Sequence, residues 1–232
     1  MAGFDLATYL GERKTFIERQ LDRILPAEAE EPREVSAAMR YGTLRGGKRL
    51  RPLMALVVAE INGFEQADVS DAACAIELVH AASLILDDLP SMDDARTRRG
   101  QPCTHLVFGE STAVLAAMDL IAIAYRLVAD NADRRGRPAA PVIAQLSNAI
   151  GHDGIVRGQH ADLAVRRKRA TLDQLTEIYT HKAAALFLAA VRIPASILDI
   201  DSNKLQALEA YALNLGLAFQ ITDDLLLSLI HI

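Results

Sequence analysis

The chain has 232 residues, of which 51% are hydrophobic and only 5% are aromatic, and it contains no tryptophan. This length supports one large core, and a composition rich in Ala, Leu, Ile and Val suits close-packed helices better than sheets. The 25 basic and 30 acidic residues give a net charge of −5, which argues against general binding of nucleic acid or anionic lipid. Cys74 and Cys103 are too few for a disulfide framework or a four-cysteine zinc site, so we expect reduced thiols in a cytoplasmic protein.

Neither a signal peptide nor a membrane span is expected. The segment Met1 to Asp5 lacks the basic-then-apolar pattern of a signal peptide. The longest apolar stretch, residues 112–128, carries Asp119 at its centre and Arg126 near its end. We interpret this stretch as a core helix of an all-α protein, with no integral membrane segment in the chain.

The rest of the pattern is helix after helix. The expected helices cover residues 4–24, 34–62 in two pieces broken near Gly42 and Gly46-Gly47, 70–88, 111–130, 141–166 with an interruption at 151–154, 171–192 before Pro194, and 201 onward. Thr171 and Gln174 form a capping box that opens the sixth of these. No alternating run of strand length and no low-complexity linker stands out, so we predict one all-α domain over residues 1–232.

Four acids in eight residues end the helix expected at 70–88, namely Asp87, Asp88, Asp93 and Asp94. The helix dipole disfavours negative charge at this end, so the acids need a counter-charge. Mg²⁺ prefers carboxylate oxygens and keeps water and phosphate oxygens as its other ligands. The segment therefore indicates a metal site, with a solvated acidic loop as the alternative.

A second acidic pair lies near the other end of the chain. Gln220, Asp223 and Asp224 are spaced i, i+3 and i+4 beside an apolar helical stripe. Gln159 and Asp162 form a weaker i, i+3 pair, for which a surface helix is the alternative. Two acidic pairs, each late in an apolar helix, favour metal binding more than either does alone.

Three basic groups accompany the acids: Lys48 with Arg51, Arg98 with Arg99, and His181 with Lys182. Arginine forks match phosphate oxygens, and a helix start after Gly46-Gly47 would offer free N–H groups to an anion. Solvated charges are the alternative for each group. Together, two acidic and three basic clusters predict a site for metal-bridged diphosphates.

These pieces, in this order, resemble the trans-type isoprenyl diphosphate synthases of the polyprenyl synthetase family, over roughly residues 33–224. The motifs that carry the resemblance are G-G-K-R-L-R-P (46–52), D-D-x-x-x-x-D (87–93) with R-R-G (98–100), G-Q-x-x-D (158–162) and F-Q-x-x-D-D (219–224). The run at residues 78–88 is most similar to bacterial geranylgeranyl diphosphate synthases of carotenoid biosynthesis.

The resemblance implies a fold, a cofactor and two substrates. The fold would be a bundle of long helices around a deep central cavity, of the isoprenoid synthase type, in a homodimer. An allylic diphosphate would bind through three Mg²⁺ ions, with Asp87 and Asp93 holding two and Asp223 the third. The implied catalytic set is Asp87, Asp88, Asp93, Lys182, Asp223 and Asp224. The implied substrate-binding set is Lys48, Arg51, His80 and Arg99 for isopentenyl diphosphate, Arg98, Lys182 and Gln220 for the allylic substrate, and Gln159.

The family resemblance also implies the reaction and a control of product length. The allylic C–O bond would ionise, the C=C of isopentenyl diphosphate would attack head-to-tail, and a proton would be lost. Ala82 and Ser83 lie about 6–8 Å below the metals along a helix. An aromatic residue commonly blocks the position of Ala82 in farnesyl-producing relatives, so a small residue predicts geranylgeranyl diphosphate.

The resemblance weakens at the C-terminus. The second acidic motif of the family usually reads D-D-x-x-D, but Leu227 stands at its last position, and an apolar run follows to Ile232. We expect a domain that is incomplete at its C-terminus, with weak or no activity. The alternatives are a farnesyl diphosphate synthase, a terpene cyclase that needs no isopentenyl site, a non-catalytic partner subunit of a full-length synthase, and a plain structural bundle.

Overall fold

The computed structural model describes residues 5–165 and 170–230, and the side chains of residues 227–230 are outside that description. The helices are α1 (Leu6–Ile24), α2 (Arg33–Leu44), α3 (Leu50–Glu60), α4 (Ser70–Asp87), α5 (Thr104–Phe108), α6 (Glu110–Arg134), α7 (Ala139–Ile150), α8 (Ile155–Val165), α9 (Leu172–Ile178), α10 (Ala185–Leu198) and α11 (Ser202–Ile230). A 3₁₀ turn, η1 (Gln66–Asp68), and a π-helical segment, η2 (Tyr179–Ala184), complete the helical elements. The predicted all-α class is confirmed.

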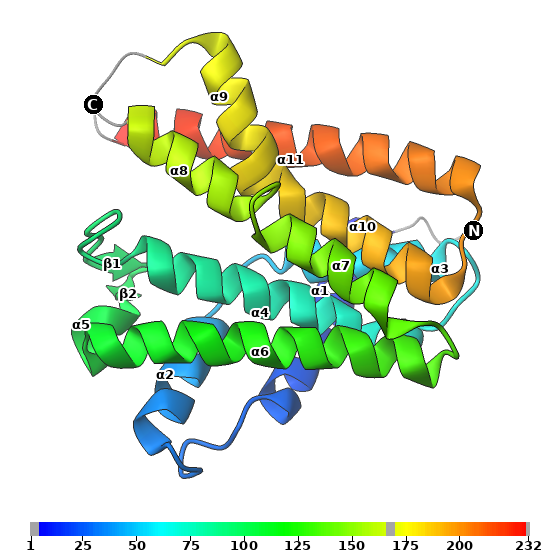
Figure 1. Cartoon of the computed structure of the whole chain (residues 1–232), viewed down its shortest axis with the longest axis horizontal. Helices are drawn as coiled ribbons and strands as arrows, with labels where there is room; N and C mark the ends of the chain where they lie inside the picture. Colours follow the sequence, from blue (N-terminus) through cyan, green and yellow to red (C-terminus); the bar gives the residue numbers. More distant parts are fainter. Residues whose placement is uncertain (1–4, 166–169, 231–232) are drawn as a thin grey trace.

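The helix α4 lies at the centre of the bundle. It runs beside α6 and also contacts α3, α10, α1 and α2 (Figure 1). Ile76, Leu78 and Val79 on different sides of α4 are all buried, as expected of a helix that is apolar all round. Because α4 is enclosed, the acids at its C-terminal end are held by a rigid element.

The long helices follow the prediction, but α5 was not predicted, α6 runs four residues past its predicted end, and two predicted breaks are wrong. Gly42 lies inside α2 rather than at a break, because it allows close packing: a Cβ there would lie 2.6 Å from Cδ1 of Ile85. Pro194 does not end the helix before it, because α10 continues through this buried proline to Leu198. Tertiary packing outweighs the local cost of proline at this position.

A small hairpin was not predicted. The strands β1 (Thr97–Arg98) and β2 (Gln101–Pro102) pair antiparallel through Arg99 and Gly100. Both turn residues have positive φ, 54° and 76°, as a tight hairpin turn requires. Strands of two residues carry no periodicity that a sequence pattern could reveal.

Two helical stretches have the length and composition of a membrane span. They are α6 and the continuous helix Leu172–Leu198, with 44% and 72% of their most apolar windows buried. The first packs against α4, α2 and α7, and the second against α3, α7 and α11. Burial inside the bundle accounts for most of the apolar window of the second helix, whereas more than half of the window of α6 is not buried, and Leu115 and Met118 are exposed on it. The positions of Met1 to Phe4 and of the side chain of Leu227 lie outside the described residues.

Candidate active site

A cavity of about 890 Å³ opens at the C-terminal end of α4. Its walls come from the loop before α3, from α4 and the segment after it, and from α8, η2 and α11. Most of the site residues expected from the sequence line it, namely Lys48, Arg51, His80, Asp87, Asp93, Arg98, Arg99, Lys182, Gln220, Asp223 and Asp224. Segments that are more than 170 residues apart in the sequence, such as those of Lys48 and Asp223, thus meet around one hollow.

Four expected residues do not line this cavity. Asp88 is buried behind it, and Gln159 is buried without a hydrogen-bond partner for either amide atom among the described residues. Ala82 is fully buried in the core. Ser83 is half-buried, and its Oγ donates to the carbonyl of His80 at 2.9 Å.

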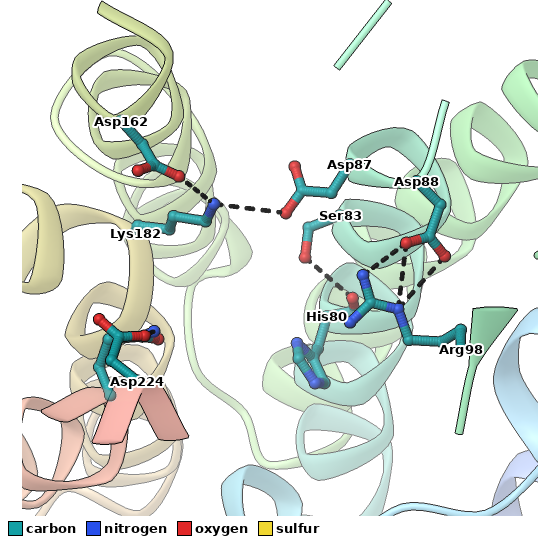
Figure 2. Close-up of polar contacts among 9 residues, drawn as sticks. His80, Ser83, Asp87, Asp88, Arg98, Asp162, Lys182 and Asp224 are labelled. Atoms are coloured by element: carbon teal, nitrogen blue, oxygen red, sulfur yellow. Dashed lines mark hydrogen bonds and ion pairs between the residues drawn. The ribbon is translucent and has the colours of Figure 1, made fainter. Parts of the chain in front are cut away.

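The two carboxylates of the first acidic pair, Asp87 and Asp88, have different surroundings. Arg98 donates to Asp88 Oδ1 from Nη2 at 2.5 Å and to Oδ2 from Nε at 3.2 Å, so Asp88 is engaged on both oxygens (Figure 2). Asp87 faces the cavity instead. The chain then folds back, because the N–H of Asp93 donates to the carbonyl of Asp87 at 2.8 Å. Burial raises the pKa of Asp87 to about 6, Lys182 opposes the rise, and Asp93 adds to it.

Lys182 bridges two walls of the cavity. Its Nζ lies 2.6 Å from Asp162 Oδ2 on α8 and 3.9 Å from Asp87 Oδ2 on α4 (Figure 2). The π-helical segment that carries Lys182 packs closely against α8, since a Cβ on Gly158 would lie 2.2 Å from the backbone nitrogen of Lys182. A single cation therefore sits between two carboxylates at the cavity mouth.

In the second acidic pair both carboxylates line the cavity, and the second of them is held by hydrogen bonds. Tyr179 Oη donates to Asp224 Oδ2 at 2.5 Å, and Gln220 Nε2 donates to Asp224 Oδ1 at 2.8 Å. Burial, and then the hydrogen bond to Asp224, raise the pKa of Tyr179 to about 12. Asp223 lines the cavity one residue earlier. In both pairs the second acid is held by neighbours.

Lys48, Arg51 and Arg99 line another part of the cavity, which we call the cationic wall. Arg51 is buried with its guanidinium carbon 4.6 Å from the ring centroid of Phe187, and Lys48 Nζ lies 5.0 Å from that of Phe219. Burial lowers the pKa of Arg51 to about 10 against the raising effect of Glu77 and Asp223. These aromatic faces stabilise cations that have few carboxylate partners.

His80 lies on this wall as a neutral imidazole. Burial, and then the charges of Arg51 and Arg99, hold the pKa of His80 well below its usual range. A neutral imidazole donates one hydrogen bond without adding charge. It is therefore suited to contact a phosphate oxygen between the arginines.

Sequence reasoning missed four charged or hydroxyl-bearing residues of the cavity: Arg45, Arg49, Glu77 and Tyr179. Glu77 stands alone among apolar residues of a buried helix, which is a signal that could have been read. Arg49 entered the sequence analysis only within the basic motif at residues 46–52, and Tyr179 belongs to none of the motifs. Their partners are 28 and 45 residues away in the sequence, so spacing could not reveal them.

The donor set fits a hard divalent cation. Asp87, Asp93 and Asp223 bring carboxylate oxygens to one cavity from two sides. Within residues 5–165 and 170–230, no three His, Cys, Asp or Glu side chains are close enough to hold an ion by themselves. Mg²⁺ commonly binds one or two carboxylates and completes its shell with water and substrate phosphates, so this arrangement suits it.

Comparison with known proteins decides the family. The model of the polyprenyl synthetase family matches residues 32–227. The chain is 41% identical to a geranylgeranyl diphosphate synthase of Pantoea ananas, over 90% of this chain and 70% of that protein. It is 40% identical to a farnesyl diphosphate synthase of Geobacillus stearothermophilus, over 97% of this chain and 76% of that protein. The chain belongs to the polyprenyl synthetase family.

A solved structure agrees with this assignment. An FPP/GFPP synthase from Zymomonas mobilis superposes with a TM-score of 0.89 at 33% identity, covering 96% of this chain and 81% of that one. As a polyprenyl synthetase, the chain is a prenyltransferase with the all-α isoprenoid synthase fold. Prenyl diphosphate synthases of this family generally use Mg²⁺. Relatives of similar identity make different products, so the comparisons leave the product open.

Proposed function

We propose that this polyprenyl synthetase condenses an allylic diphosphate with isopentenyl diphosphate head-to-tail, and that its product is geranylgeranyl diphosphate. The observation that carries the reaction is the charge division of one cavity. Carboxylates of Asp87, Asp93 and Asp223 line it together with the cations Lys48, Arg51 and Arg99. Such a cavity fits two diphosphates, one bound through metal ions on the carboxylates and the other bound directly by the lysine and arginine side chains.

The acidic side is the proposed site of the allylic diphosphate. Asp87 and Asp93 would hold two Mg²⁺ ions and Asp223 a third. When bound, Mg²⁺ neutralises diphosphate charge and makes it a better leaving group. Lys182 and Arg98 lie on the same cavity and add positive charge where the departing diphosphate gains negative charge. Asp88 keeps Arg98 in place, and Tyr179 and Gln220 keep Asp224 in place.

The cationic side is the proposed site of isopentenyl diphosphate. Lys48, Arg51 and Arg99 would bind its phosphate oxygens, and neutral His80 would donate one further hydrogen bond. Ionisation of the allylic C–O bond leaves a carbocation and a free diphosphate. The isopentenyl double bond attacks that cation, the new C–C bond forms, and loss of one proton restores a double bond. The enclosing helices exclude water that would otherwise trap the cation.

The proposed C20 product rests on the family resemblance at the small residues Ala82 and Ser83, which do not line the cavity, and farnesyl diphosphate is the alternative. Ala82 is fully buried in α4, so a larger residue there needs space from the surrounding core. We expect Ala82→Phe to shift the product from C20 to C15. An unchanged product profile in a variant that unfolds at the wild-type temperature would contradict this account of product length.

The reaction is tested by incubating the purified chain with Mg²⁺, farnesyl diphosphate and labelled isopentenyl diphosphate, followed by chromatography of the products. The expected result is labelled geranylgeranyl diphosphate formed at a low rate, and robust turnover would contradict the weak activity expected from the sequence. Product formed without isopentenyl diphosphate would indicate a cyclase. Tight Mg²⁺-dependent binding of a farnesyl diphosphate analogue without turnover would favour a non-catalytic partner subunit. Sedimentation of the same sample tests the homodimer that we also propose.

A further inference from the structure

A buried ion pair behind the cationic wall has no role in the reaction proposed above. Arg49 Nη1 donates to Glu77 Oε1 at 2.5 Å. The side chain of Arg49 is 0% exposed and that of Glu77 is 3% exposed. Burying two charges costs about as much as their attraction returns, so such a pair is weak evidence for stability alone. Its position, one helical turn before His80 on α4, indicates another role.

Arg49 joins three elements at the base of one loop. Its Nη2 donates to the carbonyl of Thr43 at 2.8 Å in the last turn of α2, while Nη1 reaches Glu77 on α4. The backbone of Arg49 adopts a left-handed conformation, with φ of 54°, directly before α3. The loop with Gly46, Gly47 and Lys48 is therefore anchored at its base by this one side chain.

The same loop is also held from the outside. The guanidinium of Arg99 donates to the carbonyl of Gly46 and lies so close to Gly47 that a Cβ there would be 2.9 Å from it. Both anchors border the cavity, but the side chain of Arg49 is 0% exposed. Arg49 is oriented by its hydrogen bond to Glu77, and Glu18 Oε1 on α1 lies 3.8 Å from its Nε.

Glu77 is the carboxylate placed among the arginines of this wall. Burial lowers the pKa of Arg51 and of Arg99, and the charge of Glu77 opposes that fall in both. By charge alone, a carboxylate at this place weakens the binding of a diphosphate. Its presence is explained if fixing the loop geometry contributes more to binding than the negative charge costs.

We propose that Glu77 and Arg49 are positioning residues for isopentenyl diphosphate, which fix the Lys48 loop and the first turn of α3 with Arg51. The inference deepens the proposed function and rests on it. It assigns the pair to one of the two substrates: loss of the pair affects isopentenyl diphosphate and leaves the allylic substrate in place.

Calorimetry of the full chain with isopentenyl diphosphate in EDTA tests the inference without requiring turnover. We expect Glu77→Gln to weaken binding about tenfold, because a small displacement of binding groups is costly. A purely electrostatic role predicts the opposite sign, namely tighter binding. Glu60→Gln is the control, since Glu60 likewise pairs with an arginine, Arg13 at 3.2 Å, but lies at the end of α3 and away from the cavity. We expect wild-type affinity for this control.

A second variant guards against loss of folding. Arg49→Met/Glu77→Leu replaces the pair by apolar side chains of similar size, which buried sites tolerate. We expect it to fold and to bind as weakly as Glu77→Gln, because the two residues act as one unit. Binding of a farnesyl diphosphate analogue with Mg²⁺ should stay within about twofold of wild type in both variants.

Four results would overturn the inference. Wild-type or tighter affinity for isopentenyl diphosphate in Glu77→Gln shows that the pair does not position the loop. Equal loss of both substrates shows a general structural role, as does a lower unfolding temperature with unchanged affinity. If the wild-type chain binds the farnesyl analogue but no isopentenyl diphosphate, the proposed condensation fails together with the inference. The wild-type measurement therefore distinguishes a failure of the proposed function from a failure of the positioning role alone.

Discussion

At the scale of single residues, His80 is the side chain whose charge is set most clearly by burial. The pKa of His80 lies well below its usual range, because the site is buried and faces Arg51, Arg99, Arg49 and Arg98. In the unfolded chain a histidine titrates near its ordinary value of about 6.5. As the pH falls through that value, the unfolded state takes up a proton that folded His80 does not. The contribution of His80 to folding stability therefore falls with falling pH, whereas that of Asp87, whose pKa is raised, rises.

The prediction is that this loss is smaller in His80→Gln. Glutamine keeps a hydrogen-bond donor and does not titrate. Urea unfolding of the substrate-free protein at pH 7.5 and pH 5.5 measures the difference. A variant that loses as much stability as wild type between these two pH values would show that His80 is not held neutral.

Tyr179 permits a second test at this scale. Tyr179→Phe removes the donor to Asp224 Oδ2 and leaves Gln220 as the remaining partner. We expect the Mg²⁺ concentration for half-maximal activity to rise several-fold, as for other residues that orient a metal site, with a stability loss of about 1 kcal/mol. Tyr211→Phe on the exposed side of α11 is the control. An unchanged Mg²⁺ requirement would mean that Asp224 needs no orientation by the phenol.

At the scale of elements, the π-helical segment η2 is positioned by two glycines on its neighbours. A Cβ on Gly158 of α8 would lie 2.2 Å from the backbone nitrogen of Lys182, and one on Gly216 of α11 would lie 2.7 Å from Cα of Ala184. Backbone atoms cannot yield as a flexible side chain can. The segment that carries Lys182 is thus fixed by close helix packing.

We predict that Gly158→Ala lowers both stability and activity. The added methyl group must push η2 away from α8, which costs about 1–3 kcal/mol and moves Lys182 from Asp162. Gly11→Ala is the control, because a Cβ at Gly11 in α1 meets nothing within 4 Å. It should stabilise the protein by about 0.5–1 kcal/mol. Thermal unfolding and turnover of the two variants provide the comparison, and equal behaviour would refute the packing argument.

Elements also show what the sequence could and could not predict. Acids late in an apolar helical pattern predicted that Asp87 and Asp223 share a site, and both line the cavity. The dipole argument applies to Asp87 at the end of the enclosed helix α4, whereas α11 continues past Asp223 to Ile230. The partners of Arg49 and Tyr179 are set by tertiary contacts, which no spacing along one helix encodes. The continuation of α10 through Pro194 likewise depends on packing that local propensity does not describe.

At the scale of the whole molecule, the cavity joins two groups of elements. The Lys48 loop, α4 and β1 form one wall, and α8, η2 and α11 form the other. Lys182 on η2 spans them by its contact with Asp87 on α4. A ligand that engages both walls links them further, and a ligand that binds only the folded state stabilises it by mass action.

The last prediction concerns inorganic pyrophosphate with Mg²⁺. At a hundred times its dissociation constant, the ligand should add about 2.7 kcal/mol, which for a chain of this size corresponds to roughly 5–10 °C in the unfolding temperature. EDTA should remove most of that increase, because Asp87, Asp93 and Asp223 repel a polyanion unless a cation lies between them. Asp223→Asn should reduce the Mg²⁺-dependent part and leave the part from the cationic wall. An equal increase in EDTA would show that pyrophosphate binds through the cations alone, and would remove the physical basis for a metal site between the two acidic pairs.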